Sequence, residues 1–420
     1  MKPYLIACLI LIIGANAFAQ PDTVQKVNQT TRNSKKQEAK PYVIMISIDG
    51  FRWDYAKKYN ATHLEDFGRK GVHASSMLPS YPSLTFPNHY AMVTGLYPSH
   101  HGIVQNYFYD RNSKSWYSYK GKTAAEGKWY GGTPLWVLAE KQQMLAASFY
   151  WVGSEANIKN TYPTYYYKYG EAIGIHDRIN TVVNWLKQPA ARRPHLITFY
   201  FPEVDHAGHK HSPGGKETIA AVHFVDSAIN ELTKAVAKTG LKLNYIVVSD
   251  HGMTAIDTTN VIPTPKIATD TNKFYRADEG VLMHLYAKHQ ADILTSYDEI
   301  KAQQKDYNIY LKNEVPANLH YRAADDCYNR IGDILLIPKW PKTFNTNHKK
   351  MDPGAHGYDP DKVMDMYAIF YAWGPNFKSH LKIPEFRNVE IYPMVAKILG
   401  LKVTDKVDGT NGLAKEVLKR

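Results

Sequence analysis

The sequence predicts an α/β fold in which a mostly parallel central sheet is covered by helices on both faces. One observation is a set of short runs rich in Val, Ile, Tyr and Phe, which are typical of buried strands. Another is that helical patterns such as residues 178–186 and 219–236 lie between many of these runs. Strands that alternate with helices imply a parallel sheet with two covered faces. The predicted strands are residues 42–48, 196–201, 245–248, 281–286, 334–337 and 367–372.

The composition is that of a globular protein, with 420 residues, 44% of them hydrophobic and 21% charged. The 51 Lys and Arg residues exceed the 39 Asp and Glu residues, but this excess is spread thinly. No block of five like charges occurs, so we expect no dedicated nucleic-acid surface. The only cysteines, Cys8 and Cys327, exclude a disulfide-stapled or thiolate-zinc protein.

Residues 1–19 have the features of a secretory signal peptide. Lys2 is basic, residues 5–13 are apolar, and Ala17 and Ala19 fit the small-x-small cleavage rule. The alternatives are an uncleaved N-terminal anchor and, less favoured, a lipoprotein modified at Cys8. We therefore expect an exported protein, periplasmic or secreted, with no membrane span after cleavage.

The rest of the chain is predicted to be a flexible leader followed by one domain. Residues 20–40 contain no aromatic residue and few apolar ones, which is typical of a flexible segment. From residue 41 to residue 420 there is no linker, repeat or low-complexity run. We expect one domain over residues 41–420, in which residues from about 260 to 350 are a candidate elaborated subdomain. We also expect the protein to be a monomer.

Three carboxylates follow predicted strands. Asp49, Asp205 and Asp250 each come just after an apolar run. The carboxyl ends of the strands form the ligand-binding edge of an open α/β sheet, so these side chains are expected to converge there. Taken singly, each Asp could instead be a turn former or a helix cap.

Imidazoles accompany these carboxylates. His209 lies four residues after Asp205, His251 follows Asp250 directly, and His356 comes much later, after a Gly-Ala pair. Carboxylates and imidazoles are ligands that zinc accepts without any thiolate. Two divalent ions would use all of these groups together with Asp49.

Thr85 is the candidate nucleophile for such a site. Residues 83–89 resemble a helix start, and a helix N-terminus offers N–H groups to an anion. Two metal ions a few ångströms apart form a clamp for in-line displacement at phosphorus. The alternative is that Thr85 only caps the helix.

Six motifs, in chain order, resemble those of the nucleotide pyrophosphatase/phosphodiesterases, a family of the alkaline phosphatase superfamily. The resemblance extends from about residue 41 to residue 413 and implies an alkaline phosphatase-like fold. It also implies a bare catalytic domain of the bacterial type, without the somatomedin-like and nuclease-like domains of long animal members. The motifs are IDGFR (48–52), PSLTFPNH (82–89), HGIVQN (101–106), DHAGH (205–209), SDHGM (249–253) and HG (356–357).

The resemblance implies two zinc ions and a covalent mechanism. Thr85 would attack phosphorus and become transiently esterified, and water would then hydrolyse the phosphothreonine. Asn106 and a backbone N–H near Thr85 would donate to a non-bridging oxygen in the transition state. The implied ligands are Asp205, His209 and His356 for one zinc, and Asp49, Thr85, Asp250 and His251 for the other.

Substrate choice rests on aromatic residues. Phe86 and Tyr169 match family positions that sandwich a nucleobase, and Tyr200 is expected to pack beside the phosphate. These residues favour a small-molecule nucleotide substrate, with hydrolysis of phosphodiester or pyrophosphate bonds and release of a nucleoside 5′-monophosphate. Three alternatives stay open: a phospholipid-headgroup phosphodiesterase, a phosphomonoesterase or phosphonate hydrolase, and a zinc-stabilised binding protein without activity. The remaining nearby histidines, expected to be packing or solvent-facing residues, are His89, His100, His101, His206 and His211.

Overall fold

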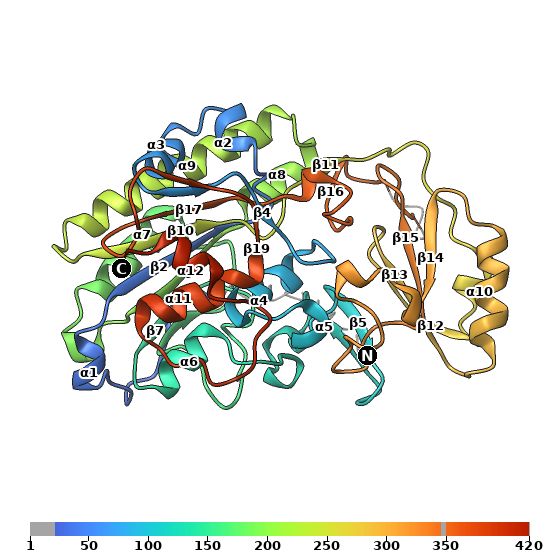
Figure 1. Ribbon diagram of the computed structural model, residues 1–420, viewed down its shortest axis with the longest axis horizontal. Helices are drawn as coiled ribbons and strands as arrows, with labels where there is room; N and C mark the ends of the chain where they lie inside the picture. The colour runs from blue at the N-terminus through green and yellow to red at the C-terminus, as the bar shows by residue number, and fades with distance from the viewer. Residues whose placement is uncertain (1–21, 346–349, 420) are drawn as a thin grey trace, which may run out of the picture.

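Figure 1 shows the computed structural model, which describes residues 22–345 and 350–419. The predicted signal peptide, residues 1–19, lies outside the described residues. Within the part of the chain that the structure describes, no helix is both long enough and apolar enough to cross a bilayer.

A nine-stranded sheet forms the centre of the molecule. In sheet order its strands are β1 (Lys26–Val27), β8 (Tyr165–Tyr167), β7 (Ala146–Phe149), β9 (Leu196–Phe201), β2 (Tyr42–Ile48), β10 (Leu243–Val248), β17 (Phe370–Trp373), β3 (Val72–Ala74) and β18 (Leu381–Ile383). The strands from β8 to β10 pair in parallel, whereas β1 and β17 join this block antiparallel. The predicted α/β fold with a mostly parallel central sheet is therefore confirmed.

Helices cover both faces of this sheet (Figure 1). Along β2, Ile44 and Ile46 share one core with α3, α7 and α9, while Val43 and Met45 share another with α4, α6 and α11. This alternation is the two-residue period of a strand that is buried on both sides. The helices are α1 (Lys35–Glu38), α2 (Tyr55–Lys58), α3 (Thr62–Lys70), α4 (Thr85–Thr94), α5 (Pro98–His101), α6 (Leu135–Lys141), α7 (Ile175–Leu186), α8 (Glu203–His211), α9 (Lys216–Ala237), α10 (Asp292–Ala302), α11 (Ile391–Leu399) and α12 (Gly412–Val417).

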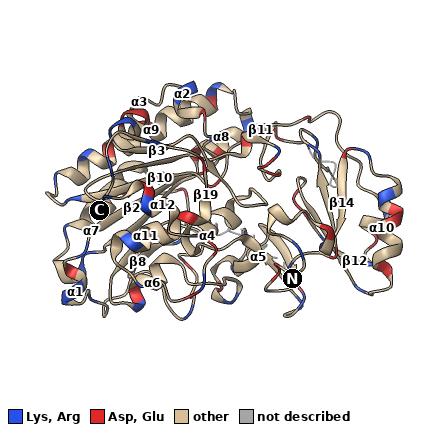
Figure 2. Ribbon diagram, in the orientation of Figure 1, with Lys and Arg blue, Asp and Glu red and all other residues tan. Residues whose placement is uncertain are grey.

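Charged residues lie mainly on the outer elements. Figure 2 shows Lys and Arg interspersed with Asp and Glu on helices such as α1, α3 and α10. The positive charge of the chain is thus distributed over its periphery.

A second sheet, which we call the accessory sheet, is antiparallel and lies beside the main body at the right of Figure 1. Its order is β12 (Phe274–Asp278), β13 (Met283–Ala287), β15 (Ile334–Pro338) and β14 (Tyr307–Leu311), and α10 packs on it. The predicted strands 281–286 and 334–337 correspond to β13 and β15. They belong to this sheet and not, as the sequence suggested, to the parallel one.

The described part of the predicted flexible leader is instead packed on the main body. β1 pairs with β8, and the Asn33 side chain is buried. The Asn33 amide donates to the carbonyl oxygens of Ala190 and Arg193, at 2.8 and 2.7 Å, and accepts the N–H of Leu145 at 2.8 Å. Val27 also packs against the core of the main body, so hydrogen bonds and one apolar side chain join this segment to the domain.

Short two-stranded sheets complete the fold around the carboxyl edge. They pair β4 (Met77–Leu78) with β19 (Phe386–Arg387), β5 (Tyr107–Asp110) with β6 (Ser115–Ser118), and β11 (Thr254–Ala255) with β16 (Gly354–Ala355). The β5–β6 hairpin faces the accessory sheet, where the ring of Tyr109 lies 4.5 Å from that of Tyr275. The carboxyl edge of the main sheet and the accessory sheet therefore meet.

Candidate active site

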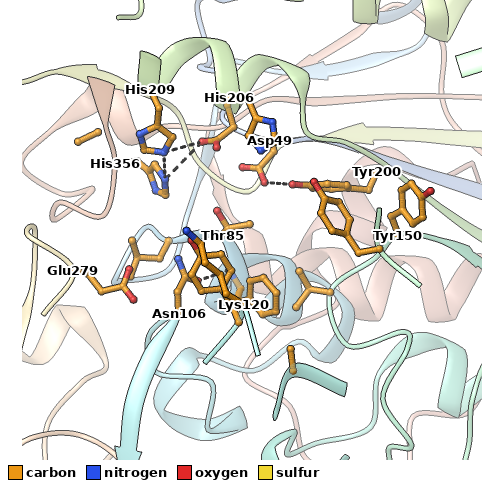
Figure 3. A pocket seen from close by; sticks show the side chains of 18 of the residues that line it. Asp49, Thr85, Asn106, Lys120, Tyr150, Tyr200, His206, His209, Glu279 and His356 are labelled. Atoms are coloured by element: carbon orange, nitrogen blue, oxygen red, sulfur yellow. Dashed lines mark hydrogen bonds and ion pairs between the residues drawn. The ribbon is translucent and has the colours of Figure 1, made fainter. Parts of the chain in front are cut away.

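A cavity of about 1050 Å³ opens at the carboxyl edge of the main sheet (Figure 3). Asp49 follows β2 directly, Asp205 lies in the first turn of α8 after β9, and Asp250 lies two residues beyond β10. Parallel strands end at the same edge, so these neighbours in the sheet bring their carboxylates together. His356 follows β16 directly and completes the cluster from the other side.

The first group of polar side chains contains Asp205, His209 and His356. Asp205 Oδ1 lies 3.4 Å from His209 Nε2 and 3.6 Å from His356 Nε2. The two imidazole Nε2 atoms are 3.1 Å apart. The Nδ1 atoms face the carbonyl oxygens of Gly354 and Ser83, at 2.8 and 2.9 Å, which leaves both Nε2 atoms directed at the carboxylate.

The second group contains Asp49, Asp250, His251 and Thr85. His251 Nε2 lies 2.9 Å from Asp250 Oδ2, 3.6 Å from Asp49 Oδ1 and 3.2 Å from Thr85 Oγ1. The two groups adjoin, because the His251 and His356 rings stack with their centroids 3.6 Å apart. The structure thus brings together all seven side chains that the sequence named as metal ligands.

The electrostatics of this cluster fit bound cations. Oδ1 of Asp49 and Oδ1 of Asp205 are buried and accept no hydrogen bond from the described residues. Burial, reinforced by the charges of Asp250 and Asp205, raises the pKa of the Asp49 carboxyl well above its ordinary value. Burial also lowers the pKa of His356, which keeps its Nε2 free as a ligand. Unpaired carboxylate oxygens beside imidazole nitrogens are the donor set that divalent zinc accepts.

Potential ligand atoms converge in two sets. Asp205, His251 and His356 form one, Asp49, Asp250 and His251 the other, and within each set the atoms lie within 4.8 Å of one another. His251 is common to both, whereas the family resemblance placed it in one site and His209 in the other. If two ions bind, the ligand atoms would be divided between them, and His251 would no longer be common to both sets.

Thr85 begins α4 and does not cap it. The N-cap residue is Leu84, and no side chain donates or accepts a cap hydrogen bond. The Thr85 hydroxyl is directed at His251 instead, at the centre of the cluster. This geometry favours the role of nucleophile over that of a helix cap.

Asn106 lies next to the start of α4. Its Oδ1 accepts the backbone N–H of Phe86 at 3.1 Å. That contact orients the amide, so its NH₂ group is the part left to face the cavity, which Asn106 lines. The N–H of Phe86 is used within the protein and is not available to a substrate in this arrangement.

Aromatic side chains line the rest of the cavity. Phe86 packs edge-on against Tyr119, with ring centroids 5.4 Å apart. Tyr169 is 46% exposed and packs edge-on against Tyr150 and Tyr200, at 5.4 and 6.0 Å. The Tyr200 hydroxyl donates to Asp49 Oδ2 at 2.5 Å, so this residue orients a metal-site carboxylate.

Sequence reasoning missed several residues around the site. His89, which was expected to be a packing or solvent-facing residue, is buried with Nδ1 3.3 Å from Asp250 Oδ2 and Nε2 2.8 Å from Ser47 Oγ. Its place in the PSLTFPNH motif was the available signal. Glu171 accepts the Tyr169 hydroxyl at 2.9 Å, and Glu279 reaches the cavity from the accessory sheet. No local pattern in the sequence marks Glu279, because it lies in a segment far along the chain from the motifs and reaches the cavity only in the folded protein.

The family model for type I phosphodiesterase/nucleotide pyrophosphatase matches residues 43–359. Mouse ectonucleotide pyrophosphatase/phosphodiesterase family member 1 is 31% identical over 394 residues, which are 90% of this chain and 43% of the relative. A venom phosphodiesterase of Macrovipera lebetinus is 31% identical over 395 residues, 90% of this chain and 45% of the relative. The chain therefore spans less than half the length of these curated relatives.

Solved structures give the same result. Murine ectonucleotide pyrophosphatase/phosphodiesterase 5 superposes with a TM-score of 0.83 at 27% identity, over 90% of this chain and 100% of that one. An inactive variant of that murine protein, solved in complex with AMP, also matches with a TM-score of 0.83, at 26% identity and over 90% of this chain. Both the family model and the superposition show that this chain belongs to the type I phosphodiesterase/nucleotide pyrophosphatase family and has its alkaline phosphatase-like fold.

Proposed function

We propose that this protein is an exported two-zinc phosphodiesterase that hydrolyses nucleotide phosphodiester and pyrophosphate bonds and releases nucleoside 5′-monophosphates. The observation that carries the proposal is the Thr85 hydroxyl, 3.2 Å from His251 Nε2, in a cluster of three carboxylates and three imidazoles. Export is supported by the signal-peptide features of residues 1–19.

Seven side chains would hold the two zinc ions. When bound, the ions would lower the pKa of the Thr85 hydroxyl and neutralise charge on the phosphoryl group. The proposed ligands are Asp205, His209 and His356 for one ion, and Asp49, Thr85, Asp250 and His251 for the other.

The chemistry then follows from the protein's own groups. Thr85 loses its hydroxyl proton to solvent, and Oγ1 forms a bond to phosphorus while the bond from phosphorus to the leaving oxygen breaks. The leaving group departs with a proton from solvent. Water then cleaves the Thr85 ester, which restores the hydroxyl and releases the nucleotide. The Asn106 amide donates to a non-bridging oxygen as charge develops there.

The residues that line the cavity are suited to bind the nucleotide part of a substrate. Phe86 and Tyr169 both line the cavity, and stacking on aromatic rings accepts any nucleobase. The AMP bound to the structural relative agrees with this assignment. Arg52 is bound to Asp54 and Asp365, at 2.6 and 3.0 Å, and is not free to neutralise the extra charge of a monoester. Lys120 and Lys210 do line the cavity, so the proposed preference for a diester rests on the family and is decided by the substrate comparison below.

A phospholipid headgroup is the second candidate substrate. The ring of Tyr169 packs edge to face against those of Tyr150 and Tyr200, and Glu171 accepts a hydrogen bond from the Tyr169 hydroxyl. Aromatic faces beside a carboxylate are suited to a quaternary ammonium group. The same pocket wall could thus bind choline in place of a base.

A comparison of substrates tests the proposal. Turnover should be measured on bis-p-nitrophenyl phosphate, p-nitrophenyl phosphate, a dinucleotide and glycerophosphocholine, with the zinc-loaded protein. We expect hydrolysis of the dinucleotide and the synthetic diester to exceed that of the monoester. Preference for glycerophosphocholine would establish the headgroup alternative, preference for the monoester would establish a phosphatase, and no turnover at all would support a binding protein.

A further inference from the structure

The loop between β8 and α7 carries two side chains that line the catalytic cavity, Tyr169 and Glu171. Both residues are exposed to solvent. A Cβ added at Gly170 or Gly174 would meet no atom within 4 Å, so the loop is not packed against the domain at either glycine. The direction of the Tyr169 ring therefore depends on the contacts that its own side chain makes.

The Tyr169 side chain makes two kinds of contact. Its ring packs edge to face against the rings of Tyr150 and Tyr200, with centroids 5.4 and 6.0 Å apart. Its hydroxyl donates a hydrogen bond to Glu171 Oε1 at 2.9 Å. Edge-to-face pairs tolerate a range of separations, which leaves the ring room to tilt, whereas a hydrogen bond restricts both distance and direction. Glu171 therefore fixes the hydroxyl end of this ring.

Glu171 in turn lies beside α8, the helix that supplies Asp205 and His209 to the cluster of candidate metal ligands. Glu171 Oε1 is 3.7 Å from Nδ1 of His206, which also lines the cavity. The same carboxylate oxygen thus lies between the Tyr169 hydroxyl and this helix. Through Glu171, the aromatic wall is joined to the side of the cavity that holds the candidate metal ligands.

The direction of the Tyr169 ring matters because stacking requires two faces to meet. A nucleobase gains stacking energy from an aromatic side chain only where the planes lie against each other. A Tyr169 ring that turned away would remove one of the two proposed stacking faces and leave that of Phe86. A ring that is already held in its binding orientation also loses less conformational entropy when the ligand binds. Such a contact affects the affinity for the nucleotide and not the chemical step.

We propose that Glu171 is a positioning residue that holds the Tyr169 ring in the orientation that receives the nucleobase. It thereby contributes to the preference for nucleotide substrates. This inference rests on the proposed function, since it assigns Glu171 a part in binding the substrate of the same site. The role acts through the Tyr169 hydroxyl and does not require the negative charge of Glu171.

Steady-state kinetics of the full zinc-loaded protein on a nucleotide p-nitrophenyl ester test this role. Glu171→Ala should raise KM about threefold to tenfold, the range expected for the loss of one hydrogen bond, and should change kcat less than about twofold. Hydrolysis of bis-p-nitrophenyl phosphate, which has no nucleobase, should change less than about twofold. Glu171→Gln keeps an acceptor oxygen for the hydroxyl and should keep KM within about twofold of the wild-type value.

A double-mutant cycle tests whether the Tyr169 hydroxyl is the group that Glu171 acts on. Tyr169→Phe keeps the ring and removes the donor, so it should raise KM by about the same factor as Glu171→Ala. Adding Glu171→Ala to Tyr169→Phe should then change KM less than about twofold further, because the contact is already absent. Glu217→Ala is the matched control and should behave as wild type. Glu217 pairs at 3.4 Å with His211, another exposed histidine of α8, but does not line the cavity.

Three results would overturn the inference. The first is an unchanged KM in Glu171→Ala, and the second is a pair of independent, multiplying effects of Glu171→Ala and Tyr169→Phe. The third is a loss in Glu171→Gln as large as that in Glu171→Ala, which would show that the charge of Glu171 acts on the ligand directly. The wild-type protein tests the proposed function separately. If it prefers the nucleotide ester to p-nitrophenyl phosphate and glycerophosphocholine, the proposed function stands whichever way Glu171 is decided, and without that preference both proposals fail.

Discussion

At the scale of single residues, the site depends on carboxylates buried among imidazoles at one sheet edge. Asp250 Oδ2 lies 2.9 Å from His251 Nε2, whereas the buried Oδ1 atoms of Asp49 and Asp205 lie 3.6 and 3.4 Å from the imidazole nitrogens of His251 and His209. Such groups destabilise a fold unless something compensates their charge. These residues were predictable because each stands directly after an apolar run or close to one, in a short motif with His or Gly.

Other site residues could not be predicted from their own surroundings in the sequence. Tyr150, Glu171 and Glu279 belong to unremarkable segments that only the folded chain brings to the cavity. Tyr200 lines the cavity, as a place beside the phosphate requires, but its hydrogen bond to Asp49 could not be predicted. Position along the chain gives no information on such contacts, since they depend on the direction of each side chain.

The aromatic wall gives a prediction about specificity. Tyr169→Ala should lower kcat/KM for a nucleotide ester about 5- to 150-fold, the equivalent of about 1 to 3 kcal/mol of lost base stacking. Hydrolysis of bis-p-nitrophenyl phosphate should change little if its small groups do not reach this wall. Tyr162→Ala is the control, because Tyr162 is similarly exposed but lies outside the cavity. Equal losses on both substrates would show that Tyr169 shapes the cleft by packing only.

At the scale of secondary structure, the sequence predicted where strands lie but did not predict which sheet each strand joins. β2 and β9 have the predicted bounds, yet β13 and β15 form the antiparallel accessory sheet. In β15, Ile334 and Leu336 face the α10 core while Leu335 and Ile337 face the core of the main body. A strand buried on both faces reads as a continuous apolar run in either kind of sheet, so the sequence alone could not separate the two.

The end of α6 gives a prediction about stability. Glu140 Oε1 accepts the N–H groups of Ala146 and Thr164, each at 2.8 Å, and burial raises the pKa of this carboxyl to about 7 from an ordinary 4.5. Between these values the folded protein retains a proton that the unfolded chain has released. Glu140 therefore lowers the free energy of unfolding as the pH rises through this range.

Glu140→Gln keeps an acceptor oxygen and removes the titration. Its free energy of unfolding relative to wild type should therefore increase between pH 5 and pH 8, by up to about 1.4 kcal/mol for each unit of pKa shift. Urea unfolding in the presence of a chelator measures this, with Glu299→Gln as the exposed control. A difference from wild type that stays constant over the whole range would contradict the prediction.

At the scale of the whole molecule, the cluster of candidate metal ligands joins segments that are far apart in the chain. Asp49 comes from the end of β2, Asp205 from α8 and His356 from the segment after β16. A ligand that binds only the folded state stabilises it, so metal bound at this point should stabilise the entire main body. Metal bound by this cluster would thus affect both the stability of the fold and the proposed activity.

Metal removal tests whether bound ions stabilise the fold. We expect two zinc ions per chain by elemental analysis, and a lower Tm after chelation that zinc restores. Asp205→Ala should lose one ion and keep much of the other, because the second group of ligands is retained. One ion or none in the unchelated wild-type protein would contradict the two-metal site.

The most direct test of the account is the activity of Thr85→Ala at a measured metal content. We predict that kcat/KM for a nucleotide p-nitrophenyl ester falls by at least about three orders of magnitude, since the attacking oxygen is lost. Zinc bound by Asp205, His209 and His356 should remain, and Thr85→Ser should keep part of the activity. Retention of more than about a tenth of the wild-type kcat/KM, a loss below about 1.4 kcal/mol, would show that Thr85 is not the nucleophile.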